Sequence, residues 1–91
     1  MRVVATHGYD RRARKLLTPQ ERTTAELEIA VAPMLWPVIA GTGGARIIYY
    51  VVTRRGVLYL IDIYAKSDKE DLTDAEKHEI RTLVATLEAD A

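Results

Sequence analysis

Two apolar runs separated by a short polar turn constrain the fold of this chain more than any other feature. Residues 46–53 (RIIYYVVT) and 57–65 (VLYLIDIYA) are both rich in β-branched and aromatic residues. The intervening Arg54-Arg55-Gly56 has the composition of a tight turn, in which glycine can adopt a positive φ. Both runs are apolar at consecutive rather than alternate positions, so we expect a hairpin of two central strands that is covered on both faces.

Capping motifs predict three helices. Asp10 is expected to cap a first helix over residues 11–17. Thr18 and Glu21 form a capping box for a second helix, which should end near Ala32 because a proline follows. Its buried face is expected to carry Thr24, Leu27, Val31 and Met34. A second capping box, Thr73 to Glu76, predicts a last helix with an apolar stripe formed by Ile80, Leu83, Val84 and Leu87.

The rest of the chain completes a single small domain over residues 1–91. Residues 3–6 predict a short strand, whereas the glycine-rich residues 40–44 predict a chain reversal. A phosphate-cradling loop is the other interpretation of this glycine-rich segment, but the Gly-Lys-Ser/Thr ending is missing. The expected order is β-α-α-β-β-α, an α+β fold with a small antiparallel sheet and the helices largely on one face. Trp36 is expected to fill the core beneath the two N-terminal helices.

Composition restricts the classes of function. The chain has 91 residues, no cysteine and a net charge of zero, which excludes a disulfide framework, a thiolate metal site and promiscuous nucleic-acid binding by a basic surface. The charge is unevenly distributed, because residues 1–55 hold nine Lys or Arg against four acids and residues 56–91 hold four against nine. The N-terminus lacks a long apolar run, so we expect no signal peptide or membrane span, and a cytoplasmic protein.

Several segments resemble one protein family, in order and over nearly the whole chain. These segments are LTPQER (17–22), VIAGTGG (38–44), RIIYY (46–50), LIDIYAK (60–66) and KEDL (69–72). They are similar to the RelE/HigB-like toxins of bacterial toxin–antitoxin pairs. The resemblance implies a RelE/ParE-like fold in which an N-terminal helical hairpin and a C-terminal helix pack on the sheet.

The resemblance also implies a reaction, the ribosome-dependent cleavage of messenger RNA, in which the RNA's own 2′-hydroxyl attacks the adjacent phosphate. It assigns catalysis to Arg46, Lys66 and Lys69, and it requires no metal or other cofactor. A guanidinium suits the scissile phosphate because it donates two parallel hydrogen bonds. Arg54, Arg55 and Tyr64 are the implied RNA contacts. The implied partners are the ribosome with its message and a cognate antitoxin, which the basic Arg11, Arg12, Arg14 and Lys15 would bind.

The chain departs from this family where Gly43-Gly44 leads directly to Arg46. In the family, a strand rich in Lys and Arg lies between two such glycine segments, so its absence would remove cationic surface. The missing strand would also leave a sheet edge exposed to homodimerisation by strand pairing. A second interpretation is therefore a catalytically degenerate toxin that binds an antitoxin and, through it, operator DNA. A third is a gyrase inhibitor of the related ParE branch.

Two further side chains carry expectations. Asp62 interrupts an apolar strand, so its carboxylate needs a partner, and Arg46 on the neighbouring strand is the candidate. Tyr9, like Tyr64, is a candidate proton donor or a platform on which a base stacks.

Overall fold

The β3–β4 hairpin forms the centre of the sheet, as the sequence predicts. In this computed structural model, which describes residues 2–31, 38–42, 44–69 and 71–89, β3 (Ala45–Val52) pairs antiparallel with β4 (Val57–Ala65). A single 3₁₀ turn, Thr53–Arg55, connects the strands, and Gly56 completes the reversal with a φ of 62°. A residue with a side chain is strained at that φ, so the glycine is required for the tight connection.

The sheet has four strands in the order β1-β4-β3-β2, and it is mixed rather than antiparallel. β1 (Arg2–Ala5) runs parallel to β4, and β2 (Val38–Thr42) runs antiparallel to β3. The predicted order of three strands is therefore wrong. The segment expected to be a chain reversal is a strand up to Thr42, and the described part of the reversal is Gly44, at a φ of 84°. Glycine is tolerated in β2 because an edge strand packs and pairs on one side only.

β2 also changes the expectation of an exposed central edge. It occupies the side of β3 that the absent family strand would leave open, so β3 is paired along both of its sides. The strands that end the sheet are β1 and β2. The predicted homodimer by strand pairing on β3 is therefore wrong, since its backbone groups are already used.

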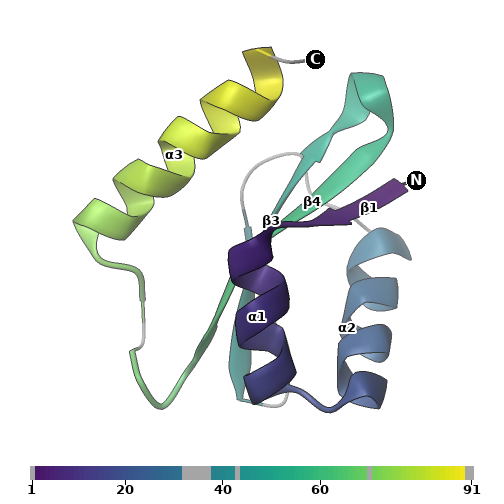
Figure 1. Cartoon of the computed structure of the whole chain (residues 1–91), viewed down its shortest axis with the longest axis vertical. Coiled ribbons are helices and arrows are strands. Elements are labelled where there is room, and N and C mark those ends of the chain that lie inside the picture. Colours follow the sequence, from purple (N-terminus) through teal and green to yellow (C-terminus); the bar gives the residue numbers. More distant parts are fainter. Residues whose placement is uncertain (1, 32–37, 43, 70, 90–91) are drawn as a thin grey trace.

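Helices cover both faces of the sheet, so the prediction of helices largely on one face is wrong (Figure 1). α1 (His7–Leu16) and α2 (Pro19–Val31) pack on one face, and α3 (Asp74–Ala89) lies across the other. The first face buries Tyr9, Ala13, Leu17, Ala25, Ile29, Ala45, Ile47, Tyr49, Val51, Leu58, Leu60 and Ile63. The second buries Ile48, Tyr50, Val52, Val57, Tyr59, Ile61 and Tyr64, with the predicted stripe of α3 partly buried against it.

Both predicted capping boxes form. At the start of α2, the Thr18 N–H donates to Glu21 Oε1 at 2.8 Å and the Glu21 N–H donates to Thr18 Oγ1 at 3.1 Å. Thr73 and Glu76 exchange the same bonds at the start of α3, at 2.9 and 3.2 Å. α1 instead begins at His7, earlier than predicted, because the Thr6 hydroxyl caps it by accepting the Tyr9 N–H at 3.1 Å.

The face that α2 buries differs from the predicted one. Ala25 and Ile29 are buried, whereas Leu27 is 61% exposed and Val31 is 84% exposed. A polar network fixes this rotation, since the buried Tyr9 hydroxyl donates to Glu26 Oε2 at 2.8 Å. The other residues expected in this region, Ala32, Met34 and Trp36, lie outside the described residues.

Within the described part of the chain, no helix is long and apolar enough to cross a membrane.

We expect the central strand to carry the stability of the fold. Leu60→Ala removes a side chain with 0% exposure and should lower the free energy of unfolding by about 2–5 kcal/mol in urea denaturation followed by circular dichroism. Leu27→Ala makes the same chemical change at an exposed site and should change stability by less than about 0.5 kcal/mol. Equal losses in the two variants would contradict this assignment of the core.

Candidate functional site

A cluster of cationic side chains and one tyrosine lies where β3 begins and β4 ends. Arg46 and Tyr64 are partners in the register of the two strands, on the face of the sheet that α3 covers. Such cross-strand neighbours lie with their side chains in contact range. Lys69 Nζ sits 5.4 Å from the centre of the Tyr64 ring. The register therefore brings Arg46 and Lys69, two of the three predicted catalytic residues, to one aromatic side chain.

Tyr64 is part of the core at this point rather than a free surface residue. Its side chain is 7% exposed, and its hydroxyl has no hydrogen-bond partner among the described residues. A buried hydroxyl without a partner is uncommon in folded proteins and often occurs at functional sites. Tyr64 presents too little ring surface here to stack on an RNA base, as the sequence interpretation required.

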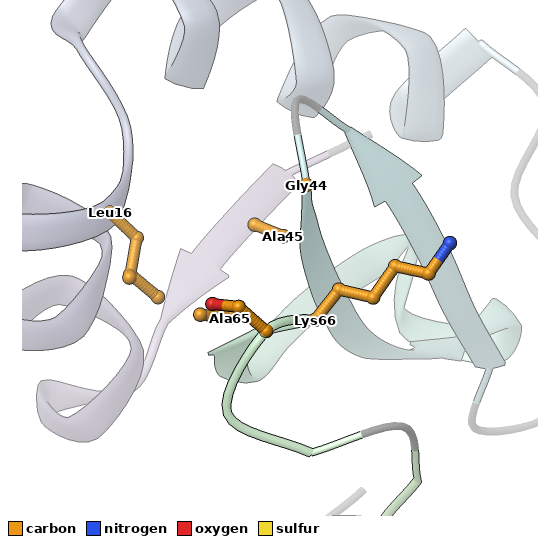
Figure 2. Close-up of a pocket in the computed structure, with 6 residues that line it drawn as sticks. Leu16, Gly44, Ala45, Ala65 and Lys66 are labelled. Carbon is orange, nitrogen blue, oxygen red and sulfur yellow. The ribbon is translucent and has the colours of Figure 1, made fainter.

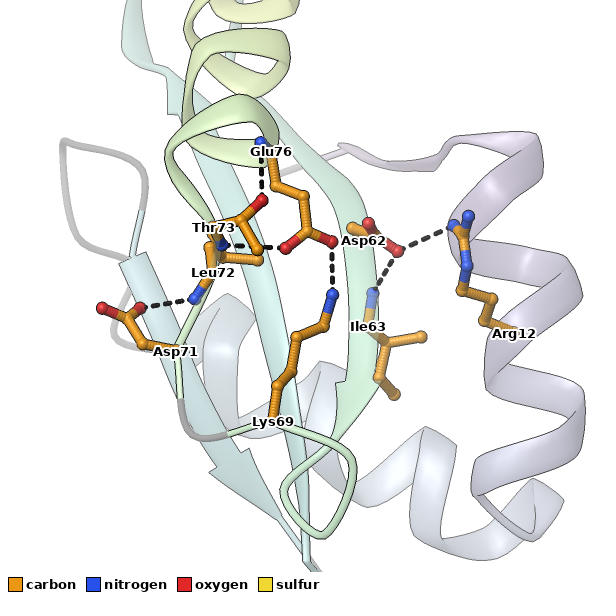
Figure 3. A network of polar contacts seen from close by, with 8 residues as sticks. All are labelled: Arg12, Asp62, Ile63, Lys69, Asp71, Leu72, Thr73 and Glu76. Atoms are coloured by element: carbon orange, nitrogen blue, oxygen red, sulfur yellow. Dashed lines mark hydrogen bonds and ion pairs between the residues drawn. The ribbon is translucent and has the colours of Figure 1, made fainter.

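Lys69 is held by a carboxylate that sequence reasoning did not single out. Its ammonium forms an ion pair with Glu76 Oε2, and the other oxygen of Glu76 accepts the Thr73 N–H (Figure 3). The hydrogen bond from Lys69, followed by that from the Thr73 backbone, lowers the pKa of Glu76 from its ordinary 4.5 to about 2. Glu76 is therefore a stable anion and a weak proton acceptor. The capping box predicted where α3 starts, but not that its Glu would also reach back across the preceding loop.

Asp62 has a partner, but it is Arg12 of α1 rather than Arg46. Arg12 donates to Asp62 Oδ1 at 2.8 Å, and the same oxygen accepts the Ile63 N–H at 2.8 Å (Figure 3). In the register Asp62 lies opposite Ile48, which is two residues beyond Arg46.

A bulge in β4 explains why α1 supplies the partner of Asp62. Ile48 pairs with Asp62 while Tyr49 pairs with Leu60, so Ile61 is an extra residue in β4. The Thr6 hydroxyl donates to the Ile61 carbonyl at 2.7 Å. This bond fixes the start of α1 against the bulge and directs the helix along β4.

These side chains surround a cavity of about 330 Å³ between α1, the end of β4 and the start of α3. Its lining includes the cations Arg12, Lys15 and Lys69, the acids Asp62, Asp68 and Glu76, and Tyr64. Cations and carboxylates are equal in number, and two of the cations are already paired. The cavity can thus offer several hydrogen bonds but only a weak net attraction for an anion.

A second hollow, of about 470 Å³, opens on the α1 side of the same sheet end. Ala45 and Ala65 are opposite each other in the register and leave this space below Leu16 (Figure 2). Lys66 also lines it, although its side chain extends away from Leu16. The Lys66 N–H donates to the Gly44 carbonyl at 2.8 Å, which fixes this exposed cation beside the start of β3 and hence near Arg46.

The predicted RNA contacts Arg54 and Arg55 are not brought into the cluster. They lie in the turn at the opposite end of β3 and β4. Arg54 donates to the carbonyl and carboxylate of Glu88, at 2.5 and 3.1 Å, and Tyr50 donates to the same carboxylate at 2.6 Å. Arg54 thus attaches the end of α3 to the hairpin, whereas Arg55 is exposed.

The four predicted partner-binding cations of α1 differ in their surroundings. Arg12 is paired with Asp62, and Arg14 is paired with Asp10 at 2.8 Å. Arg11 and Lys15 are exposed, with no ion pair to any residue that the structure describes. These two remain available to an acidic partner.

Tyr9 is a structural residue, so the prediction that it donates a proton or stacks on a base is wrong. Its side chain has 0% exposure, and Arg22 lies 5.2 Å from the centre of its ring. Burial, together with the hydrogen bond to Glu26, raises the pKa of the Tyr9 hydroxyl far above its usual value. Arg22 also bonds Glu26 and Asp10, at 2.7 and 2.9 Å, and so ties α2 to α1.

Among the described residues, no group of three His, Cys, Asp or Glu side chains is placed to hold a metal ion. No protein-family model matches the chain, and no curated protein sequence matches it either. Any assignment of function therefore depends on the sequence segments and on the geometry of the cluster.

The Lys69–Glu76 pair should produce a measurable acid sensitivity. Because the pKa of Glu76 is lower in the folded protein than its ordinary 4.5, the pair stabilises the fold above about pH 4.5, and this contribution is lost as the pH falls towards 2. Glu76→Gln should therefore flatten the fall of unfolding free energy over this window.

Glu79→Gln is the matched control for this pH series. Glu79 is exposed on the same helix, and its side chain makes no ion pair with the residues that the structure describes. This variant should keep the wild-type pH dependence. A Glu76→Gln curve parallel to the wild-type curve from pH 5 to pH 2 would contradict the pairing.

Proposed function

We propose that this chain is a RelE/HigB-like toxin that cleaves messenger RNA on the ribosome and is neutralised by an antitoxin protein. One observation carries the proposal: Arg46, Lys66 and Lys69, which are far apart in pairs along the chain, lie together at the end of the β3–β4 hairpin. Cations that converge on one sheet end without a metal suit the chemistry of phosphate transfer by RNA itself.

In this reaction the 2′-oxygen attacks the adjacent phosphorus, the bond to the 5′-oxygen breaks, and a cyclic phosphate and a 5′-hydroxyl result. Arg46 is half-buried on a central strand, which limits its motion and suits a two-pronged grip on the phosphate. Lys66, being exposed, adds charge beside it. Glu76 is a poor proton acceptor because of its lowered pKa, so the chain contributes mainly position and charge.

A second candidate function is a catalytically degenerate toxin homologue that binds an antitoxin without cutting RNA. The equal number of cations and carboxylates around the 330 Å³ cavity favours it, since Lys69 and Arg12 are both neutralised locally. Exposed Arg11 and Lys15 on α1 would then meet the acidic groups of the partner. The two functions differ in whether Arg46 matters to a cell.

Induced expression in bacteria separates the two functions. The wild type should arrest growth and produce cleavage ends in codon phase, seen by primer extension on one abundant message. Arg46→Ala should reduce the cleavage rate by about 10²–10³, the usual effect of losing one group that stabilises charge in the transition state. Arg46→Lys keeps the charge but loses the paired geometry, so it should fall between the two.

Arg81→Ala is the control, because Arg81 is an exposed residue of α3 away from the cluster. It should arrest growth like the wild type. Normal growth with intact messages from soluble wild-type protein would exclude the nuclease and favour the antitoxin-binding module.

A further inference from the structure

Glu76 occupies an unusual position for the capping residue of a helix, because it also holds a cation of the candidate site. We propose that Glu76 masks Lys69 and so sets the affinity of the site for RNA phosphate, an inference that rests on the proposed function. Glu76 is then a residue that tunes RNA binding rather than one that takes part in bond breaking.

The geometry fixes the Glu76 carboxylate from two sides. One oxygen accepts the Thr73 N–H at 2.9 Å, and the Glu76 N–H donates back to the Thr73 hydroxyl at 3.2 Å. The other oxygen contacts the ammonium of Lys69 (Figure 3). The capping box thus holds the carboxylate at the first turn of α3, and Lys69 is the mobile partner, with four rotatable bonds in its side chain.

The same contact determines where Lys69 points. Its ammonium lies over the Tyr64 ring, 5.4 Å from the ring centre, and about a third of its side chain is exposed. Tyr64 is opposite Arg46 in the register, so Lys69 is placed beside the residue proposed to grip the phosphate. A phosphate that approaches Arg46 therefore meets a lysine whose charge is cancelled, together with a carboxylate that repels it.

The neighbouring Arg12–Asp62 pair does not offer the same release. Asp62 also accepts the Ile63 N–H, and Arg12 is part of the contact between α1 and β4. Loss of that pair would disturb the packing of α1. Glu76→Gln is a milder change, because glutamine still accepts the Thr73 N–H and a capping box uses either residue.

The test is the binding of a fluorescein-labelled 12-nucleotide oligouridine, measured by fluorescence anisotropy at several salt concentrations. Glu76→Gln should bind about two- to fivefold more tightly than the wild type at low salt, the range for one partly exposed ionic contact. The slope of log affinity against log salt should steepen by about 0.7, as expected for one additional phosphate contact on a single strand.

Two further variants make the test specific. Glu79→Gln removes one negative charge from the exposed surface of α3, so any gain it shows measures the effect of net charge alone. Combining Lys69→Ala with Glu76→Gln should abolish the gain, because the unmasked ammonium is no longer present. A gain equal to that of Glu79→Gln, a gain that persists without Lys69, or no binding by any variant at low salt would each overturn the proposal.

Cleavage of ribosome-bound message by the same variants distinguishes failure of this inference from failure of the proposed function. Tighter, Lys69-dependent binding by Glu76→Gln without cleavage by any variant supports masking and contradicts the nuclease. Cleavage by the wild type with unchanged binding by Glu76→Gln supports the nuclease and contradicts masking.

Discussion

The burial of the β3–β4 hairpin on both faces is the constraint on which the rest of the structure depends. Ile47 and Leu60 face one helical layer, while Ile48 and Tyr59 face the other. Apolar side chains on both faces need cover from both sides, which α1 and α2 supply on one face and α3 on the other. The short strands β1 and β2 then pair with its two open edges.

The candidate site is a consequence of where this hairpin ends. Beyond Ala65 the chain leaves the sheet, and the apolar pattern gives way to charged residues that no core can bury. Register places Tyr64 beside Arg46, and the capping box of α3 returns Glu76 to Lys69. The same folding that gathers the cations therefore also neutralises some of them, so binding strength at this site is a balance between exposed and paired charge.

Local signals were predictable from the sequence, and long-range ones were not. The hairpin, both capping boxes and the stripe of α3 depend on residues close in sequence. The start of α1 was not predictable because Thr6 and Asp10 are both good caps, and only the fold engages Asp10 with Arg22. β2 was hidden because its glycine is typical of a turn.

The face of α2 and the masking of Lys69 escaped prediction for a related reason. Both depend on side chains that meet across packed elements or across a loop: Tyr9 with Glu26, and Lys69 with Glu76. The most direct test of the central claim is photocrosslinking of a single-stranded RNA that contains 4-thiouridine, followed by peptide mapping. Crosslinks on peptides that contain Arg46 and residues 64–69 are predicted. Crosslinks confined to the basic stretch of α1, or to the turn at Arg54 and Arg55, would contradict the account.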